Sequence, residues 1–391
     1  MKKLITIIVL TYLLFTINST ASNQVSDGNN LENQKLLKIG VLLPLSGKFK
    51  GIGESFLKAI QLALYDISDV KIKIYPKDTA ANALVAYNSA KELEENGITI
   101  IIGPIFHESL ERLYEINNVT FISLTNKTKK IPNNIIAFGI NTKSQINVLK
   151  KYFKKIGISK TLFLSPQKLY EEQAQIITDS KINFQKIFTY NTSPKKITEE
   201  IEKLTNYRER KRELEIRIKI LEKSELYKDK NELKELELKH TLGVVNFDSV
   251  IIVDFGERLK SVLTSFVFSD ISAEQVSFFS INQWFDETLF DEIALKNLHF
   301  PSIDYKNLKK FKKKYFKAYK ENPNQVAILA YDALGLIYHC WYNNDFEFNS
   351  KLLTNKEGFK GLHGEFVIEN NISKQKLKIY KVAGNKFIKV Y

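Results

Sequence analysis

The stretch KIGVLLPLSGKFKGIGESFLKAIQLALYDI, residues 38–67, decides the fold. Residues 39–43 are an apolar run typical of a buried strand, and residues 54–67 repeat apolar side chains at the spacing of an amphipathic helix. The turn between them, residues 44–53, is rich in glycine. Such a turn can hold the phosphates of a dinucleotide, because glycine lets the backbone approach closely and a helix N-terminus favours anions. It can equally form the first wall of a cleft for another ligand.

The alternation of strand and helix continues along the chain in two series. Each predicted strand is apolar on both faces, which is typical of a parallel sheet covered by helices on both sides. The first series has further strands at 71–76, 98–104 and 119–123, and the second has strands at 160–165, 181–190, 248–254 and 275–281. Because 391 residues exceed a single core, the sequence predicts an α/β protein of two doubly wound parallel-sheet lobes.

The last part of the chain no longer alternates. Two long helices are predicted at 304–321 and 324–342, followed by short paired strands that suggest an antiparallel sheet edge. We expect the two helices to return to the first lobe to cover its sheet. The first lobe is therefore predicted to contain residues 36–140 and 302–355, and the second lobe residues 141–301 and 356–391.

A charged segment at about 197–240 interrupts the second series. Its apolar residues recur at the three-, four- and seven-residue steps of a narrow coiled-coil seam, and a polar stretch divides it into two helical pieces. The pattern predicts a helical hairpin that projects from the second lobe. It fits a solvated helix pair and a partner-binding arm equally well.

The N-terminal residues have the composition of an export signal. Lys2 and Lys3 precede an apolar run at 4–15, which is shorter than the roughly 20 residues of a spanning helix, and small residues follow. We expect cleavage after Ala21, a disordered lead-in at 22–35, and a periplasmic protein that is not inserted in the membrane. An uncleaved anchor is the alternative.

The sequence favours no catalytic, cofactor or metal chemistry. The third position of a dinucleotide fingerprint holds Phe56, where close packing needs a small residue, and the phosphate-loop motif is missing. The five histidines are too scattered to share a metal, and no hydrolase nucleophile elbow occurs. The single cysteine, Cys340, lies on an apolar helix pattern, which predicts a buried structural thiol without a disulfide or lipid. We therefore expect neither an enzyme nor a cofactor.

The basic charge does not indicate nucleic-acid binding. The formal net charge is +14, but the lysines are dispersed over predicted helices, and no arginine-rich block with interleaved aromatic residues occurs. This distribution favours a solvated surface.

Polar side chains follow two of the predicted strands. Asp254 ends the strand at 248–254. Ser123 ends the strand at 119–123, and Thr125 and Asn126 follow it. The carboxyl ends of parallel strands are where open sheets contact ligands. The same residues can instead cap the helices that follow, so a structural role stays open for each.

The order of the segments resembles a known family. The stretch at 39–64, KDT (77–79), IIIGPIF (100–106), FISLTN (121–126), LAYDALGLI (329–337) and GFKGLHGEFVIE (358–369) are similar to the type I periplasmic binding fold of leucine/isoleucine/valine-binding proteins. The resemblance covers residues 38–391, interrupted by the charged segment. Together with the segments at 247–263 and 281–290, that segment resembles the penicillin-binding protein activator branch.

The resemblance implies two lobes joined by three crossings that close by a hinge motion on a ligand in the cleft. Matched residue by residue, the implied ligand contacts are Ser46, Gly47, Ser123, Thr125, Asn126, Tyr170 and Asp254. The hydroxyl and backbone groups would bind the carboxylate of an amino acid, and Asp254 its ammonium group. The opening turn at 44–53 is then the first wall of a cleft.

Two departures from the family pattern bear on the function. Ile105, Phe106 and His107 stand where amino-acid binders have small hydroxyl residues, and no glycine follows Tyr170. The altered cleft and the added arm favour a non-enzymatic regulator that contacts a cell-wall synthase. The alternative is a substrate-binding protein that delivers an amino acid or another small polar solute to an ABC permease, favoured by Ser123, Thr125 and Asp254.

Overall fold

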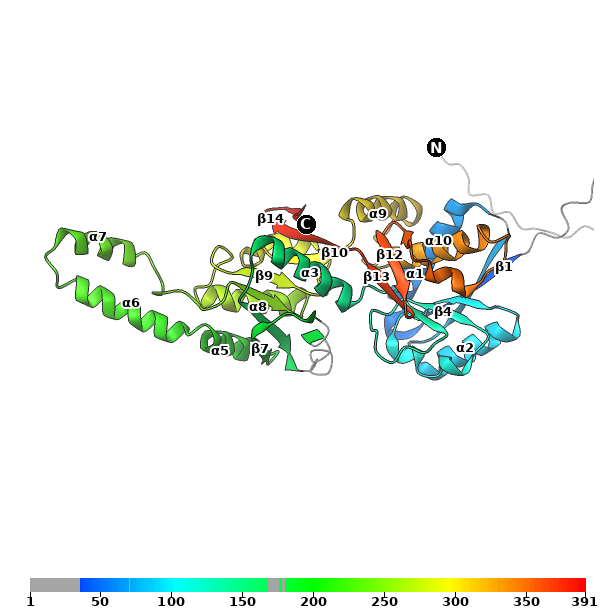
Figure 1. The fold of residues 1–391 in the computed structure, drawn as a ribbon, viewed down its shortest axis with the longest axis horizontal. Helices are drawn as coiled ribbons and strands as arrows, with labels where there is room; N and C mark the ends of the chain where they lie inside the picture. The colour runs from blue at the N-terminus through cyan, green and yellow to red at the C-terminus, as the bar shows by residue number, and fades with distance from the viewer. Residues whose placement is uncertain (1–35, 70, 168–175, 178–179) are drawn as a thin grey trace, which may run out of the picture. The chain divides into compact units, whose positions relative to one another are not determined.

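The computed structural model describes residues 36–69, 71–167, 176–177 and 180–391. These residues form two mixed, mostly parallel sheets flanked by helices (Figure 1). The predicted signal peptide (1–21), the predicted lead-in (22–35) and Tyr170 lie outside the described residues.

The first sheet contains the strand of the opening stretch, β1, near one edge. In the described part of the chain this sheet has eight strands in the order β11 (Phe359–Lys360), β12 (Glu365–Glu369), β13 (Ile372–Gln375), β5 (Ile135–Ala137), β4 (Thr120–Ser123), β3 (Ile100–Ile102), β1 (Leu37–Leu43) and β2 (Ile72–Asp78). The strands from β5 to β2 are parallel. Six of the seven residues of β1 are buried, and Lys38 is the exposed one, as expected for a strand covered on both sides.

Helices from both halves of the sequence cover the first sheet. They are α1 (Lys50–Ile67), α2 (Ala83–Glu95), α9 (Tyr305–Tyr319) and α10 (Ile328–Tyr342), with the short 3-10 helices η1 (Gly47–Phe49), η2 (His107–Leu110), η3 (Leu113–Glu115) and η7 (Ser350–Thr354). The packing of α10 on α1 joins segments that are far apart in the sequence. It is reinforced by a hydrogen bond of 2.6 Å from the Tyr331 hydroxyl to Asp66 Oδ2.

The second sheet repeats the arrangement. Among the described residues its strands follow the order β15 (Lys386–Lys389), β14 (Lys378–Ala383), β10 (His299–Ser302), β9 (Ser277–Ser280), β8 (Ser249–Ile252), β6 (Thr161–Pro166) and β7 (Phe184–Tyr190). Its helices are α3 (Thr142–Ile156), α5 (Pro194–Leu204) and α8 (Gly256–Phe268), with the 3-10 helices η5 (Glu287–Asp291) and η6 (Ile293–Leu295).

The chain passes between the two sheets three times. It leaves the first sheet after β5, returns after β10 to form α9 and α10, and leaves again after β13 to form β14. The predicted fold class, two doubly wound α/β lobes connected by three crossings, is confirmed.

The sheet membership of residues 359–375 differs from the prediction, which placed all of 356–391 in the second lobe. Strand β13 pairs in parallel with β5 through Ile372 and Ala137, and the Asn371 side chain donates to Asn133 O at 2.7 Å. Only β14 and β15 belong to the second sheet. An alternating apolar pattern predicts a strand but does not specify which sheet edge accepts it, because edge pairing is made through backbone groups.

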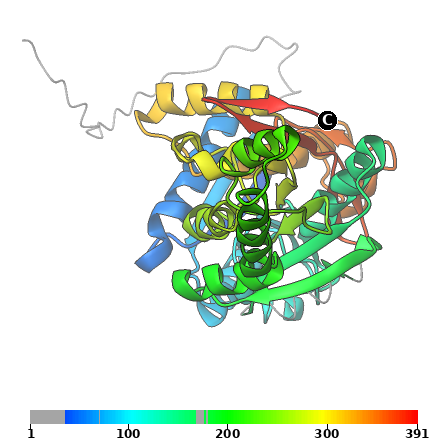
Figure 2. The ribbon, with the colours of Figure 1, turned by 90° about the vertical axis from the view of Figure 1, so that its left-hand side faces the viewer.

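The charged segment forms a hairpin of α6 (Tyr207–Leu221) and α7 (Tyr227–Leu236), here called the arm (206–242). The two helices pack together in Figure 1, and Figure 2 turns this side of the molecule toward the viewer. Leu214, Leu221 and Leu236 form a small core of their own, and Arg217 binds Glu232 through two hydrogen bonds of 2.8 Å.

The arm begins later than predicted. Ile197 and Ile201, assigned to it from the spacing, lie on α5 and are buried in the main core, where α5 packs on α8. The left-handed backbone of Asn206, with a φ of 51°, separates α5 from α6. The apolar spacing continues across this break because α5 faces the lobe while α6 faces α7.

Two smaller expectations concern the single cysteine and membrane-spanning helices. Cys340 is buried, and burial raises the pKa of its thiol to about 11, as fits a structural residue. Of the helices in the described ranges, none combines the length and hydropathy needed to cross a membrane.

Candidate functional site

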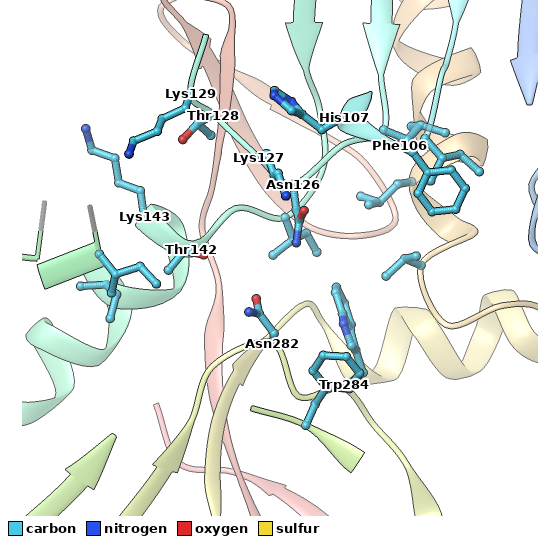
Figure 3. A pocket seen from close by; sticks show the side chains of 18 of the residues that line it. Phe106, His107, Asn126, Lys127, Thr128, Lys129, Thr142, Lys143, Asn282 and Trp284 are labelled. Carbon is cyan, nitrogen blue, oxygen red and sulfur yellow. The ribbon is translucent and has the colours of Figure 1, made fainter. Parts of the chain in front are cut away.

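A pocket of about 730 Å³ lies where loops from both sheets meet (Figure 3). It is lined by residues that follow β3, β4 and β5 of the first sheet and β8 and β9 of the second, together with residues of α3 and α10. Most of these loops leave the carboxyl ends of parallel strands, which is where open α/β sheets bind ligands. The pocket is therefore the candidate functional site.

The loop after β3 is held by its own backbone packing. A Cβ on Gly103 would lie 2.1 Å from the carbonyl oxygen of Leu42, and its φ is +106°, so only glycine fits there. Ser123 is fully buried, and its hydroxyl donates to Pro104 O at 2.8 Å. These contacts place Phe106 and the residue after it at the pocket.

The loop after β4 is held in a similar way. A Cβ on Gly139 would lie 2.2 Å from Thr125 O, and the Gly139 N–H donates to that oxygen at 3.0 Å. The Thr125 side chain is buried and accepts a hydrogen bond of 3.3 Å from Lys127 N. Ser123 and Thr125 thus shape the loop, while residues 126–130 line the pocket.

Asp254 is the most heavily bonded of the predicted site residues. The residue is 2% exposed, and its carboxylate accepts hydrogen bonds from Tyr190 OH at 2.8 Å, Phe255 N at 2.9 Å, and Arg258 Nε at 2.9 and 3.0 Å. The N-cap residue of α8 is Phe255, so Asp254 itself does not occupy the capping position. Burial, and next the Asp254 charge, raise the pKa of Tyr190. Asp254 orients Arg258, which lines the pocket.

The opening turn does not line the pocket. Ser46 and Gly47 are exposed, and Asp78 holds the turn by accepting from Leu45 N at 2.7 Å. Burial acts to raise the pKa of Asp78, but hydrogen bonds from the Ser46 hydroxyl and from backbone amides lower it overall. A Cβ on Gly53 would lie 2.1 Å from Pro44 O, so this glycine serves the packing of α1 on its own turn.

The structure therefore separates the predicted site residues. Asn126 lines the pocket, whereas Ser46, Gly47, Ser123, Thr125 and Asp254 are outside its lining, and Tyr170 lies outside the described residues. Ligand contact by these six residues stays a prediction.

The sequence reasoning missed the basic side chains of the pocket. Those in the lining are His107, Lys127, Lys129, Lys130, Lys143 and Arg258. A signal was available, because the run NKTKK at 126–130 directly follows a strand end, the position where Asn126 was selected. Lysine-rich runs are usually solvated, so only the pocket shows that this one faces a concave surface.

The pocket has no acidic lining among the residues that the structure describes. Lys127 lies 3.9 Å from Glu108, and Arg258 is paired with Asp254. For Lys129, Lys130 and Lys143, no ion pair with another described residue is found. Excess positive charge in a concave site raises the local concentration of anions.

The pocket also has apolar lining. Phe106, Phe255 and Trp284 contribute aromatic rings, and aliphatic side chains from both lobes line other parts of it. In Figure 3, Lys129 and Lys143 extend on one side of the pocket, and Phe106 and Trp284 lie toward the other. The pocket thus has a cationic part and an apolar part.

Asn282 is fixed between the two parts. Its side-chain oxygen accepts a hydrogen bond of 3.0 Å from Gln145 Nε2, and its backbone N–H donates to Gln145 Oε1 at 2.8 Å. Gln145 lies on α3 and is 2% exposed, so this amide pair is rigidly held. It connects the loop after β9 to the first turn of α3, beside Lys143.

The pocket offers groups that can bind a ligand. Across the described ranges, no group of three or more histidine, cysteine, aspartate or glutamate side chains is placed to hold a metal ion. The functional groups that do converge are cations, amides and aromatic rings, which recognise a ligand through charge, hydrogen bonds and apolar contact.

Comparison with known proteins agrees with this arrangement. Residues 37–187 match a family described as periplasmic binding protein. The LivJ substrate-binding protein of Streptococcus pneumoniae, solved with isoleucine, is 16% identical with a TM-score of 0.57, over 91% of this chain and 100% of that one. The chain has the type I periplasmic binding fold. The predicted resemblance is confirmed.

Two other structures with the type I periplasmic binding fold show its range of roles. The C-domain of LpoA from Haemophilus influenzae, a regulator of PBP1A, is 16% identical with a TM-score of 0.61, over 90% of this chain and 100% of that one. A solute-binding protein of an ABC transporter from Rhodopseudomonas palustris, in complex with 3,4-dihydroxybenzoic acid, is 16% identical. Its TM-score is 0.60, over 91% of this chain and 96% of that one. A search of curated protein sequences found no match.

Both activator-like and transporter-like proteins are therefore similar in fold to this chain. These similar proteins bind ligands or regulate a partner, and at this level of identity the likeness concerns the fold alone.

Proposed function

We propose that the chain is a non-enzymatic solute receptor of the periplasm, which binds a small molecule in the pocket and presents it to a membrane transporter. The observation that carries this proposal is the pocket itself. It has about 730 Å³ of space, a size typical of small-molecule sites, and it is lined from both lobes. A hinge motion of two lobes around such a pocket would convert ligand binding into a change of shape that a permease can recognise.

The departures of the cleft residues from the family pattern do not weigh against this role. The departures at Ile105, Phe106 and His107 contribute directly to the pocket lining. They replace hydroxyl groups by apolar and aromatic surface, which changes the class of ligand and leaves a cavity in place.

The test is a ligand screen with a blocked pocket as control. Purified protein is screened by thermal shift and calorimetry against amino acids, organic acids, sugars and phosphate esters. Asn126→Trp places a bulky ring in the pocket from an exposed loop position and should abolish binding of any hit. Asn133→Trp, at an exposed position outside the lining, should leave binding unchanged. Binding that survives Asn126→Trp, or a screen without hits, contradicts the proposal.

The second candidate function is regulation of a cell-wall synthase through the arm. The arm favours it because its helices have a separate core and also carry exposed apolar side chains, Ile216 and Ile220, at 50% and 55% exposure. Exposed apolar residues on a helix can mark a protein contact.

This candidate is tested with a purified penicillin-binding protein of the same organism. The expected result is binding that is lost in the double variant Ile216→Glu, Ile220→Glu and kept in Asn126→Trp. Binding that depends on the pocket variant and not on the arm variant would contradict an arm-mediated role.

A further inference from the structure

We infer that the pocket selects an organic anion with an apolar body and without an ammonium group. This inference rests on the proposed function and specifies the ligand class of the same pocket. It replaces the α-amino acid expected from the family resemblance.

The charge of the lining is the first argument. Lys129, Lys130 and Lys143 line the pocket without an ion pair to another described residue, and Arg258 adds a guanidinium group. Within the described lining no carboxylate offsets these charges. A carboxylate or phosphate on the ligand would supply the missing counter-charge.

The absence of a free acidic group near the expected ammonium position is the second argument. Asp254 is the residue that would pair with an ammonium group, but it is 2% exposed and already accepts hydrogen bonds from Arg258, Tyr190 and Phe255 N. Pairing with a ligand would require the Arg258 contact to break. Arg258, four residues after Asp254, lines the pocket whereas Asp254 does not, so an ammonium group would meet a like charge.

The apolar part of the lining is the third argument. Phe106 and Trp284 lie on the side of the pocket away from Lys129 and Lys143 in Figure 3. A ligand that fills both parts has a charged end and an apolar end. Burial of the apolar end would favour binding, because it removes apolar surface from water.

Carboxylates and phosphate monoesters share this chemistry, and the experiment separates them. Purified full-length protein is titrated by calorimetry at low salt with 3-phenylpropanoate, 2-phenylethyl phosphate, 3-phenylpropanamide and L-phenylalanine. The first two are anions, the third is the neutral counterpart of the first, and the fourth adds an ammonium group to it. The aliphatic set of 4-methylpentanoate, 4-methylpentanamide and L-leucine tests a smaller apolar end.

The expected result is binding by at least one anion and weaker binding, by about tenfold or more, of its amide and its amino acid, since a hydrogen bond to a charged group is worth about 1.5 to 3 kcal/mol. Affinity should fall as sodium chloride is raised, because salt screens exposed charges. Whether the carboxylate or the phosphate binds more tightly identifies the anion.

Charge variants locate the effect. Lys129→Gln and Lys143→Gln should each weaken the binding anion by about threefold to tenfold, a range reduced for solvent exposure. Lys151→Gln removes the same charge from an exposed position on α3 outside the lining and serves as the control. Its affinity should match that of the wild type.

Several outcomes overturn the inference. They are equal or tighter binding of the amide or the amino acid, an effect of Lys151→Gln as large as that of the pocket lysines, and no binding by any of these probes. If the inference fails in the first way, a solute still binds in the pocket and the proposed function stands. If the broad screen also yields no ligand, both fail.

Discussion

Two arginines of the second lobe, Arg210 and Arg258, differ in burial and in the number of protein groups that they contact. Arg210 is 6% exposed and donates to Thr205 O at 3.0 Å, Thr241 Oγ1 at 2.7 Å and Ser269 O at 2.6 Å. The side chain of Arg258 is 50% exposed and is bonded to a single carboxylate, Asp254. Arg210 has its donors used by the protein, whereas Arg258 keeps donors directed to solvent and to the pocket.

The difference separates an anchor from a recognition group. Arg210 joins the first turn of α6 to the end of α8, so it fixes the arm on the lobe. Burial lowers the pKa of its guanidinium, and the nearby Asp270 opposes this shift. A buried guanidinium whose three nitrogens all donate within the protein has little left to offer a ligand, whereas a half-exposed one can still donate to it.

The largest effect is expected for Arg210→Ala. The substitution leaves two buried carbonyl groups and Thr241 without a donor, so the free energy of unfolding should fall by about 3 to 5 kcal/mol, measured by urea denaturation. Arg208→Ala, at a side chain that is 84% exposed, is the control and should change stability by less than about 0.5 kcal/mol. Similar losses in both variants would remove the distinction between an anchor and a surface arginine.

A buried base that stays neutral gives the next largest effect. Burial lowers the pKa of His299 from 6.5 to about 4. Between these values the unfolded chain binds a proton that the folded chain does not, so stability is complete above pH 6.5 and falls as the pH drops to 4. The loss should reach about 3 kcal/mol, at 1.36 kcal/mol for each pKa unit.

The measurement is the urea midpoint as a function of pH. His299→Phe keeps an aromatic ring beside Phe279, whose ring centroid lies 5.0 Å from that of His299, and should flatten the decline between pH 6.5 and 4. An unchanged pH profile in this variant would assign the acid sensitivity to other groups.

Arg258→Ala should have a smaller effect than Arg210→Ala. It leaves the Asp254 carboxylate buried with only Tyr190 and Phe255 N as donors, so we expect a loss of about 1 to 2 kcal/mol. The double variant Arg258→Ala, Asp254→Asn should recover part of it, because the uncompensated charge is gone. A double-mutant cycle in urea denaturation measures the coupling, and a coupling near zero would contradict the pairing as a stabilising contact.

Deletion of the outer arm should have the smallest effect. Removing residues 213–238 and joining the ends by a short Gly/Ser linker takes out only the separate arm core and keeps Arg210. The linker can be short, because the two ends of the arm lie close together: Leu242 N donates to Arg210 O at 3.0 Å. We expect a change of less than about 1 kcal/mol in the unfolding free energy of the lobes, whereas a molten product would show that the arm belongs to the main core.

A wider deletion that begins at Thr205 would cost more stability. It removes Arg210 together with the outer arm, so its cost should approach that of Arg210→Ala. The spacing of apolar residues made the whole segment appear uniform, and the long-range contacts of Arg210 to Thr241 and Ser269 distinguish its base from its tip.

The site illustrates the same limit. The positions after β4 and β8 were correctly recognised as strand ends, because buried apolar runs are followed there by polar residues. Which polar residue faces the pocket could not be read from that pattern. The Ser123 hydroxyl donates to Pro104 O, 19 residues away in sequence, and the Asp254 carboxylate accepts from Arg258, 4 residues away. Both groups are therefore engaged within the protein.

The sequence by itself determined the two doubly wound lobes, because the period of apolar side chains is a local property that each strand and helix expresses before it packs. Tertiary structure alone decided that β12 and β13 join the first sheet, that the arm starts at its arginine anchor, and that Lys129, Lys143 and Trp284 share a pocket. Those outcomes depend on backbone pairing, charge neutralisation and pocket formation between segments that are distant in the sequence. None of these contacts produces a periodic pattern of residues.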